Sequence, residues 1–536
     1  MPTFASKPTP GEAKLRGGYY TPEPIGRFVA GWVAEAGRRL LEPSCGDGAI
    51  LQHLVAAAGR RSVTAIELFP AEAAKAGTSI GVTVVCADFF SWFTADRHGS
   101  FDGVAGNPPY IRFGSWDEPS RTLALDLLRA EGLRPTKLTN AWLPFVVASV
   151  LAVRPGGRVG LVLPAELLQV GYAAALRSYL VDSCSQITVV SFAQLVFPGI
   201  LQEVVLLLAE RGEGPAGIRT VEVRDAAALD QLDLAGAPAV RAHLHESEKW
   251  TKYYLGIEAI EALRTVRTDG RLLPLSHYAE VDVGVVTGRN SFFCMSAVEA
   301  KRRGLSRLTM PLVARSYQVP GLVFTAEDLA ALDETDAATR LLVLPESLES
   351  SRNTKLLSYL AEGAADGVPD GHKCRIRRSW WRVPSIWVPD GFMLRQISTH
   401  PRLTDNRTGA TSTDTVHRVR VQPGVAMDRL ATGAYNSATF ALAEVLGRSY
   451  GGGILELEPT ECEHLPVPDP ALVPAALVQK VDELVRAGRP TDALDLVDQA
   501  ILVEKLGFST IEVLALRTAW MQLRDRRTRR SKRSTT

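Results

Sequence analysis

The sequence has few cysteines, and their spacing suits neither a disulfide framework nor a zinc site. Only six of the 536 residues are cysteine, and no two of them form a Cys-x-x-Cys pair. This usage is typical of reduced thiols in the cytoplasm and argues against a structural metal. We therefore expect a cytoplasmic protein that binds no metal ion.

Long apolar runs are also missing. No stretch of about 18 or more uncharged apolar residues occurs, so no membrane span is predicted. Residues 1–16 are polar and lack the apolar core of a secretory signal. We therefore expect neither a membrane-bound nor a secreted protein.

A large net charge is absent as well, but the charge is unevenly distributed. The formal net charge is +1; residues 1–250 hold 23 basic and 25 acidic residues, whereas the last 22 residues hold eight basic and one acidic. A local excess of positive charge is typical of a surface that contacts nucleic acid. The alternative is that the basic tail, Arg524–Arg533, is a disordered solubilising end.

Length and composition indicate a globular chain of two or three domains. With 536 residues, of which 46% are hydrophobic and 22% charged, the chain is too long for one ordinary core. An alanine- and acid-rich region ends near residue 245, and a regular Leu/Val/Ala periodicity that predicts helices begins near residue 471. We expect domains at residues 1–245, 246–470 and 471–536.

The most informative stretch is Asn107-Pro108-Pro109-Tyr110. It follows an apolar run, residues 101–106, that is typical of a buried parallel strand. Two prolines end strand pairing and stiffen the loop, and open α/β sheets bind ligands at the carboxyl ends of their strands. An amide, a carbonyl and an aromatic ring in such a loop suit a planar ring that carries an exocyclic amino group. The alternative is an ordinary turn, because Asn-Pro often begins one.

Three earlier predicted strands also end in polar groups. In chain order these groups are Glu42 with the loop Cys45-Gly46-Asp47-Gly48, then Glu67, and then Asp88 with Phe89. Glycines let a backbone approach a ligand closely, and an acid about 20 residues further on can reach ribose hydroxyls. Leu51 replaces the third glycine of the dinucleotide pattern, so a cofactor with a single nucleoside is favoured over a pyrophosphate.

The apolar pattern continues with three further strands, at residues 158–164, 187–192 and 203–208. Between the last two lies an apolar loop, residues 194–200, with Phe197 at its centre. By position alone, such a phenylalanine is more often part of the core than of a functional site.

Taken in order, these motifs resemble those of one enzyme family. They are Tyr-Tyr-Thr-Pro (19–22), Glu-Pro-Ser-Cys-Gly-Asp-Gly (42–48), Ala-Ile-Glu-Leu (65–68), Ala-Asp-Phe-Phe (87–90), Asn-Pro-Pro-Tyr (107–110) and Val-Phe-Pro-Gly (196–199). Over roughly residues 17–210 the set resembles the gamma class of adenine-N6 DNA methyltransferases, the TaqI-like enzymes of restriction–modification systems.

The resemblance implies an α/β fold in several parts. The first is a Rossmann-like, S-adenosylmethionine-dependent methyltransferase domain with a seven-stranded, mostly parallel sheet. An α+β DNA target-recognition domain follows, and then a helical C-terminal region with the basic tail.

The resemblance also implies which residues bind the cofactor, S-adenosylmethionine. They are Thr21, Glu42, Cys45, Gly46, Gly48, Glu67, Asp88 and Phe89. Glu67 would bind the ribose hydroxyls, and Asp88 and Phe89 the adenine, with Phe145 a weaker candidate for the other face of that ring. The remaining residues would hold the methionine part.

The catalytic residues implied by the resemblance are Asn107, Pro108, Pro109 and Tyr110. The Asn107 side chain and the Pro108 carbonyl would accept hydrogen bonds from the N6 amino group of the target adenine. Because that atom lies inside a stacked duplex, the base must be flipped out of double-stranded DNA. Tyr110 and Phe197 would contact its two faces.

In the second half of the sequence, three stretches attract attention: 283–293, with a Gly-Arg-Asn turn; 373–382, with five cations and two tryptophans; and 414–420, whose alternation predicts a half-exposed strand. Interleaved arginine and tryptophan are suited to phosphate and base contacts. The DNA-binding candidates are Arg375, Arg377, Arg378, Trp380 and Trp381. The alternative is a structural segment with core tryptophans and solvated arginines.

Two other functions remain open at this point. Protein glutamine-N5 methyltransferases also carry Asn-Pro-Pro-Tyr, although the Tyr-Tyr-Thr-Pro motif, the Phe197 loop and the long basic-aromatic extension argue against that substrate. A catalytically silent DNA-recognition subunit is disfavoured by the intact motif set. We expect double-stranded DNA as the partner, with a cognate restriction endonuclease encoded separately as a further candidate.

Overall fold

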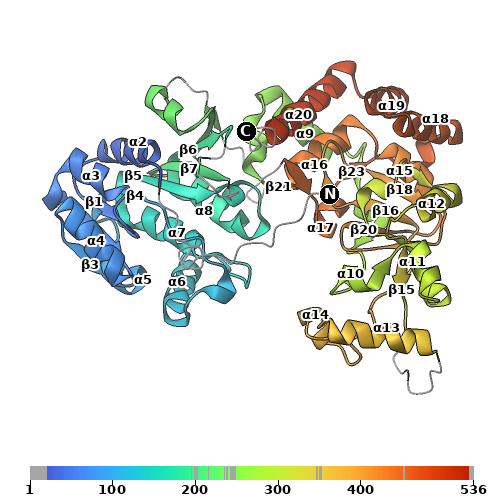
Figure 1. Ribbon diagram of the computed structural model, residues 1–536. Coiled ribbons are helices and arrows are strands. Elements are labelled where there is room, and N and C mark those ends of the chain that lie inside the picture. The colour runs from blue at the N-terminus through green and yellow to red at the C-terminus, as the bar shows by residue number, and fades with distance from the viewer. Residues whose placement is uncertain are drawn as a thin grey trace. The chain divides into compact units, whose positions relative to one another are not determined.

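A computed structural model describes residues 21–529, apart from short gaps at 195, 198–202, 215, 235, 237–238, 242–248, 346–347, 349–352 and 451–452. The chain divides into two compact units (Figure 1). The N-terminal unit comprises Met1–Gly256 with Arg529–Thr536, and the C-terminal unit comprises Ile257–Thr528. The finer division at 245/246 and 470/471 stays a prediction.

The N-terminal unit is built on one large sheet (Figure 1). Its strand order is β3-β2-β1-β4-β5-β7-β6-β8-β9. The strands are β1 Leu40–Glu42, β2 Val63–Glu67, β3 Val84–Cys86, β4 Phe101–Gly106, β5 Val153–Pro164, β6 Cys184–Phe192, β7 Val204–Arg211, β8 Gly217–Val223 and β9 Ala239–Arg241. Strands β3, β2, β1, β4 and β5 are parallel neighbours, and β7 runs antiparallel between β5 and β6. The predicted α/β class and the seven predicted strands are confirmed.

Two further strands extend this sheet beyond the seven expected. Strand β8 pairs with β6 in parallel, and β9 pairs with β8 in the antiparallel sense. The sequence pattern identified this region only as an acid-rich transition. Its strand character comes from the sheet edge that β6 offers, and burial of Ile218 and Val223 accompanies the pairing.

Helices pack on the faces of the sheet. They are α2 Glu23–Ala34, α3 Leu51–Ala58, α4 Pro70–Ile80, α5 Phe89–Trp92, α6 Glu118–Ala130, α7 Trp142–Ala152 and α8 Ala174–Ser183. Proline occupies the first turn of α2, where its missing N–H costs nothing. Ile25, Val29 and Val33 of this helix are fully buried and share a core cluster with Ala105 and other sheet residues. All residues of α7 are buried, as its uniformly apolar sequence requires.

The described residues of the C-terminal unit form four smaller sheets, with strand orders β11-β20-β16-β18-β14, β12-β15-β13-β19, β17-β22-β21 and β10-β23. The strands are β10 Leu273–Pro274, β11 Ala279–Asp282, β12 Cys294–Met295, β13 Thr309–Val313, β14 Val323–Phe324, β15 Arg340–Leu342, β16 Gly391–Leu394, β17 Gln396–Ile397, β18 Leu403–Asn406, β19 Thr411–Ser412, β20 Val416–Val421, β21 Arg448–Tyr450, β22 Ile454–Glu456 and β23 Pro466–Val467.

The expectation of a half-exposed strand at residues 414–420 is wrong. Strand β20 lies between β11 and β16, and four consecutive residues, 416–419, are buried. Arg418 is only 2% exposed because its guanidinium donates to the carbonyls of Val283 and Ser385, pairs with Asp282 and stacks on Trp387. A buried cation with this many partners is tolerated, and the sequence pattern alone does not reveal those partners.

The helices of the C-terminal unit are α9 Ile257–Thr268, α10 Asn290–Phe293, α11 Ala297–Arg302, α12 Ala326–Asp333, α13 Thr354–Ala365, α14 His372–Arg375, α15 Met427–Gly433, α16 Ser437–Leu446, α17 Pro459–Glu463, α18 Ala475–Arg486, α19 Pro490–Val497 and α20 Thr510–Arg529. The last three confirm the predicted helical C-terminal region.

The basic tail is partly structural. The first basic residues of the tail belong to helix α20. Among them, Arg527 is 3% exposed, pairs with buried Glu444 and donates to the Ser398 and Gly453 carbonyls. Arg517 pairs with the buried Asp498. These positive charges are therefore compensated within the C-terminal unit. Residues 530–533 of the predicted tail lie outside the described residues.

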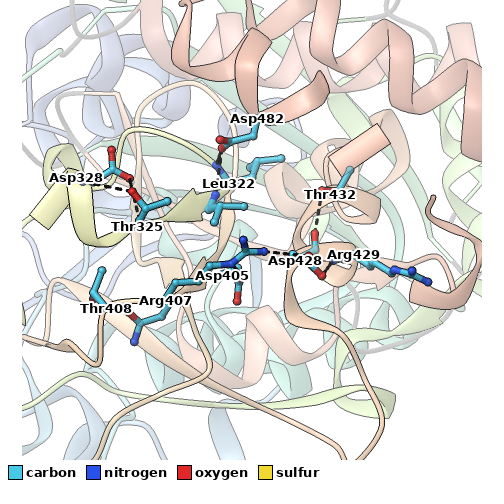
Figure 2. A network of polar contacts seen from close by, with 12 residues as sticks. Leu322, Thr325, Asp328, Asp405, Arg407, Thr408, Asp428, Arg429, Thr432 and Asp482 are labelled. Carbon is cyan, nitrogen blue, oxygen red and sulfur yellow. Dashed lines mark hydrogen bonds and ion pairs between the residues drawn. The ribbon is translucent and has the colours of Figure 1, made fainter. Parts of the chain in front are cut away.

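A polar network links α18 to the strands of the C-terminal unit (Figure 2). One carboxylate oxygen of Asp482 accepts hydrogen bonds from the backbone N–H groups of Leu322 and Val323, at 2.6 and 3.1 Å. Arg486, one turn further along α18, pairs with Asp482 and with Asp328 of α12. Because both acids are mostly buried, these pairs are less screened than surface pairs.

The close approach of α18 to the backbone requires glycine at position 321. A Cβ atom there would lie 2.2 Å from the Asp482 carboxylate oxygen. We expect Gly321→Ala to lower the free energy of unfolding by about 1–3 kcal/mol, because the helix must shift or lose these bonds. Urea unfolding followed by circular dichroism measures this change. Gly31→Ala is the control, since a Cβ atom at that exposed position of α2 meets nothing within 4 Å; equal loss in both variants would refute the steric explanation.

Candidate functional site

The polar groups predicted from four strand ends are brought together at one edge of the large sheet. Strands β1, β2 and β4 are parallel neighbours, with Glu42 paired beside Ala65 and Leu41 beside Val104. Their carboxyl ends therefore meet at the same edge. Asn107 and Glu67 lie at this edge on opposite sides of β1.

The Asn107 side chain forms a hydrogen bond with the first described residue of the chain. Its amide nitrogen donates to the Thr21 hydroxyl oxygen at 3.1 Å, and Thr21 is 8% exposed. The Ser44 hydroxyl donates to the Asn107 main-chain carbonyl at 3.4 Å. The Asn-Pro-Pro-Tyr loop is thus linked both to the segment before α2 and to the loop after β1. Pro108 is buried and Pro109 is half-buried. Tyr19 and Tyr20 of the first motif lie outside the described residues.

Tyr110 and Phe197 belong to the same apolar cluster. The Tyr110 hydroxyl donates to the Val162 carbonyl of β5 at 3.0 Å, which fixes the ring against the end of that strand. Phe197 is 5% exposed and, like Tyr110, packs within the core cluster that includes Val29 of α2. The Pro198 to Ile200 part of the Phe197 loop lies outside the described residues.

The loop after β1 has the backbone conformation that its glycines permit. Gly46 and Gly48 adopt φ angles of 54° and 93°, in the left-handed region that disfavours other residues. The Gly46 N–H donates to one carboxylate oxygen of Glu67 at 2.9 Å, and the Phe69 N–H donates to the other at 2.8 Å. A Cβ atom at Gly46 would meet nothing within 4 Å, whereas one at Gly48 would lie 2.4 Å from Ile80. Gly48 therefore allows close packing on α4, and the space into which a Gly46 Cβ atom would point is open.

Glu42 is a buried acid that lacks a complete set of partners. It is 1% exposed, and its Oε2 atom has no hydrogen-bond partner among the described residues. Burial, reinforced by the charges of Glu67 and Asp47, raises the pKa of the Glu42 carboxyl well above its ordinary value. Such a group is suited to bind a cation or an N–H donor. Burial likewise raises the pKa of the neighbouring Cys45 thiol, which is 5% exposed and therefore unsuited to be a nucleophile.

Asp88 has partners within the fold. Its Oδ1 atom caps α5 by accepting from the Ser91 N–H at 2.8 Å, and its Oδ2 atom accepts from the Ser120 hydroxyl at 2.6 Å. A carboxylate has about four lone-pair sites, so these bonds leave acceptor capacity for a ligand.

Phe89 is a core residue, 3% exposed, and its ring stacks directly on that of Phe145 with centroids 5.2 Å apart. A third ring between them would need about 7 Å, twice the usual contact distance. The two rings in this arrangement therefore do not enclose an adenine from both faces.

The DNA-binding candidates of the C-terminal unit differ in how their charges are used. Arg375 and Arg378 are exposed. Arg377 instead donates to the carbonyls of Val286 and Thr287, each at 2.9 Å. Its guanidinium is committed to the backbone of a second segment.

The two tryptophans of that segment pack against an apolar cluster. The Trp380 ring lies 5.5 Å from that of Phe292 and 5.9 Å from that of Trp381. The indole N–H of Trp381 donates to the Pro345 carbonyl at 3.2 Å. Both rings remain partly exposed.

Two residues of the site were missed by the sequence reasoning. Ser44 contacts the Asn107 carbonyl, and Ser120 contacts Asp88. Ser44 could have been found from its place between Glu42 and Gly46, whereas no sequence signal marks Ser120. Among the described residues no cluster of three or more His, Cys, Asp or Glu side chains is arranged to hold a metal. None of the helices in the described ranges is both long and apolar enough to span a bilayer.

Two protein-family models and several curated proteins match this chain. Residues 3–226 match the family model for N-6 DNA Methylase, and residues 247–502 match that for the C-terminal domain of the Type II methyltransferase M.Eco57I. The Type II methyltransferase M.XamI of Xanthomonas campestris pv. amaranthicola is 24% identical over 479 residues, which are 85% of this chain and 86% of that protein. The Type II methyltransferase M.AccI of Acinetobacter calcoaceticus is 21% identical over 468 residues, 83% of each chain.

A solved structure has a similar fold. The Type IIL restriction-modification enzyme MmeI in complex with DNA matches with a TM-score of 0.56 and 10% identity, over 94% of this chain and 75% of that one. At this identity the likeness concerns the fold alone.

The family matches and the similar curated proteins define the chain as a DNA methyltransferase. More particularly, it is an N6-adenine DNA methyltransferase of the restriction–modification type. Its assignment to the gamma class stays a prediction.

The raised pKa of Glu42 predicts how pH affects stability when no cofactor is added. Because the folded-state pKa exceeds the unfolded value of about 4.3, ionisation of Glu42 opposes folding, and this cost grows as pH rises above that value. We expect Glu42→Gln to raise the melting temperature more at pH 8 than at pH 5. The exposed Glu261→Gln is the control, and a Glu42→Gln effect that is the same at both pH values would contradict the assignment.

Proposed function

We propose that this protein transfers a methyl group from S-adenosylmethionine to N6 of an adenine flipped out of double-stranded DNA at a specific sequence. One observation carries the proposal: Thr21, Asn107, the glycine loop and Glu67 are joined by hydrogen bonds at a single sheet edge. We infer that residues 1–245 catalyse, that residues 246–470 recognise the target, and that a separately encoded endonuclease cleaves unmodified DNA.

The residues at the glycine loop fit the proposed cofactor. The Glu42 carboxylate, buried and with one oxygen unpartnered among the described residues, matches the ammonium of a methionine group. Glu67 accepts one backbone N–H at each oxygen and keeps lone pairs for ribose hydroxyls. The open space at Gly46 leaves room beside them. When bound, S-adenosylmethionine supplies an electrophilic methyl carbon.

For the cofactor's adenine we propose Asp88 and Phe89, with contact at an edge of the Phe89–Phe145 stack. That geometry follows because the two rings already touch. The spare acceptor capacity of Asp88 is available to an exocyclic amino group.

Asn107 and Pro108 are the proposed catalytic acceptors. An adenine amino group is a poor nucleophile because its lone pair is delocalised into the ring. Two fixed acceptors, the Asn107 amide oxygen and the Pro108 carbonyl, would accept hydrogen bonds from its two N–H groups. These bonds would make the nitrogen more tetrahedral. Preorganised acceptors of this kind act chiefly by positioning. Pro109 keeps this corner of the backbone rigid.

The Thr21 contact has a role in this scheme. By accepting from the amide nitrogen of Asn107, Thr21 turns the amide oxygen away from itself. The oxygen is then the atom that would accept from the target base. We propose Thr21 as a positioning residue for Asn107, in addition to its place beside the cofactor.

Tyr110 and Phe197 are proposed to contact the flipped adenine. Base flipping costs a few kcal/mol, and stacking on an aromatic ring returns about 1–3 kcal/mol per base. The hydrogen bond from Tyr110 to Val162 lowers the entropy cost of that stacking, because the ring is already immobilised.

The first test replaces Asn107. We expect Asn107→Ala to lower kcat for labelled methyl transfer to duplex DNA by about 10²–10³-fold or more, since an acceptor preorganised for the reacting nitrogen is lost. The affinity for S-adenosylmethionine, measured by calorimetry, should stay within about twofold of the wild type. Asn107→Asp, which keeps an acceptor oxygen, should retain more activity than the alanine variant.

Near-normal turnover in Asn107→Ala would refute the mechanism. Methyl transfer to a glutamine-containing peptide instead of DNA by the wild type would refute the substrate.

A second test concerns Thr21. Thr21→Val keeps the shape but removes the hydroxyl that accepts from Asn107, so kcat should fall about three- to tenfold, as expected for one hydrogen bond. Thr21→Ser should restore kcat. If Thr21→Val instead raises KM for S-adenosylmethionine and leaves kcat unchanged, Thr21 acts on the cofactor and does not position Asn107.

A further inference from the structure

Two segments that are far apart in the sequence form one surface of the C-terminal unit. They are the turn at Gly288-Arg289, before α10, and the basic segment 372–382, which begins with α14. Thr287 and Cys374, 87 residues apart, lie in contact, with the Cys374 sulfur 3.9 Å from the Thr287 carbonyl oxygen. In Figure 1, α13 and α14 lie at one end of this unit, next to α10 and β15.

The contact between the two segments is close and specific. Gly288 has a φ of 84°, and a Cβ atom there would lie 2.9 Å from the Cβ atom of Lys373. Arg377 reaches back to donate to the carbonyls of Val286 and Thr287. Val286, Thr287 and Gly288 are consecutive residues of the turn. By binding the first two, Arg377 holds the turn against α14.

The surface has a rigid base. Phe292 and Phe293 of α10 pack against Trp380, with ring centroids 5.5 and 6.5 Å apart, and Phe292 stacks on Tyr359 of α13 at 4.6 Å. The Tyr359 hydroxyl donates to the Phe292 carbonyl at 2.6 Å. The aromatic residues of the basic segment therefore anchor it, and its cations Lys373 and Arg375 are left exposed.

Three cations of the surface formed by the two segments are available to a ligand. Arg289, Lys373 and Arg375 are exposed, and among the described residues none of their side chains has an ion pair or hydrogen bond. Residues 372–382 contain five lysines and arginines and no acid. The nearest acids before the segment are Asp366 and Asp370.

We propose that Arg289, Lys373 and Arg375 form a phosphate-binding site for the DNA backbone and that Arg377 is the positioning residue that aligns its two halves. Flexible cations on a rigid base are suited to phosphate contacts, which orient a protein on a duplex without reading sequence. This inference rests on the proposed function, because it takes duplex DNA as the substrate. It adds Arg289 and Lys373 to the DNA contacts and assigns Arg377, Trp380 and Trp381 to the scaffold beneath them.

The test compares two charge-matched double variants of the full chain. Arg289→Gln/Arg375→Gln removes two cations of the proposed site. Lys480→Gln/Lys505→Gln removes two exposed cations elsewhere in the C-terminal unit. Fluorescence anisotropy at several salt concentrations gives the Kd for a duplex that contains the target and for one that does not.

Near 0.1 M salt, we expect the first double variant to raise Kd about tenfold for each lost contact, equally for both duplexes. The slope of the logarithm of the binding constant against the logarithm of the salt concentration should become shallower by about two. The control variant should leave Kd and slope unchanged. At saturating DNA, kcat should match the wild type, because the cofactor and target-base residues are intact.

Equal behaviour of the two double variants would overturn the phosphate site. A loss confined to the target duplex would also overturn it, since base reading and not phosphate binding would then be disturbed. Failure of the wild type to methylate any DNA would refute the proposed function itself, and DNA affinity measured without turnover keeps the two outcomes distinct.

Gly288→Ala tests the alignment of the two halves without a change in charge. The added methyl group must push the turn away from Lys373, so Kd should rise severalfold for both duplexes while the melting temperature shows that the unit is folded. An unchanged Kd in Gly288→Ala, beside a weakened Arg289→Gln/Arg375→Gln, would overturn the proposed alignment of the two halves by the close packing of Gly288 on Lys373.

Discussion

The site depends on one constraint: parallel neighbouring strands end at the same edge of a sheet. Strands β1, β2 and β4 satisfy it, and each ends in a group that can bind a ligand. The hydrogen bonds from Asn107 to Thr21 and from Gly46 to Glu67 then join segments that are separate in the sequence. Without the shared edge these loops would not meet, and neither a cofactor nor a target base could be held by both.

Each unit contains a buried glutamate, and the two glutamates differ in whether a cation compensates their charge. Glu42 is buried beside other acids and keeps an oxygen without a partner among the described residues, so its ionised form is unfavourable until a cation arrives. Glu444 is also buried but is paired with Arg527. The first arrangement leaves binding capacity and costs stability, whereas the second has its charge compensated within the fold. This difference separates a candidate site from a structural ion pair.

Where sequence reasoning failed, the cause was a partner distant in the chain. The alternating pattern at 414–420 predicts one exposed face, but β11 and β16 enclose β20, and Arg418 obtains carbonyl and carboxylate partners from other segments. Arg377 looked like its neighbours Arg375 and Arg378, yet its guanidinium is bound to a turn some 90 residues earlier. Strand β8 was missed because its pairing with β6 is not local.

The sequence by itself determined the α/β class, the strands β1 to β7, the terminal helices and the identity of the residues at the strand ends, because apolar periodicity, proline and glycine act locally. Only the tertiary structure decided which of these groups touch. It paired Asn107 with Thr21, set Phe89 directly on Phe145, and divided one run of arginines into a structural latch and exposed cations. The physical reason is that hydrogen bonding and burial depend on what packs against a residue, and a linear pattern does not contain that information.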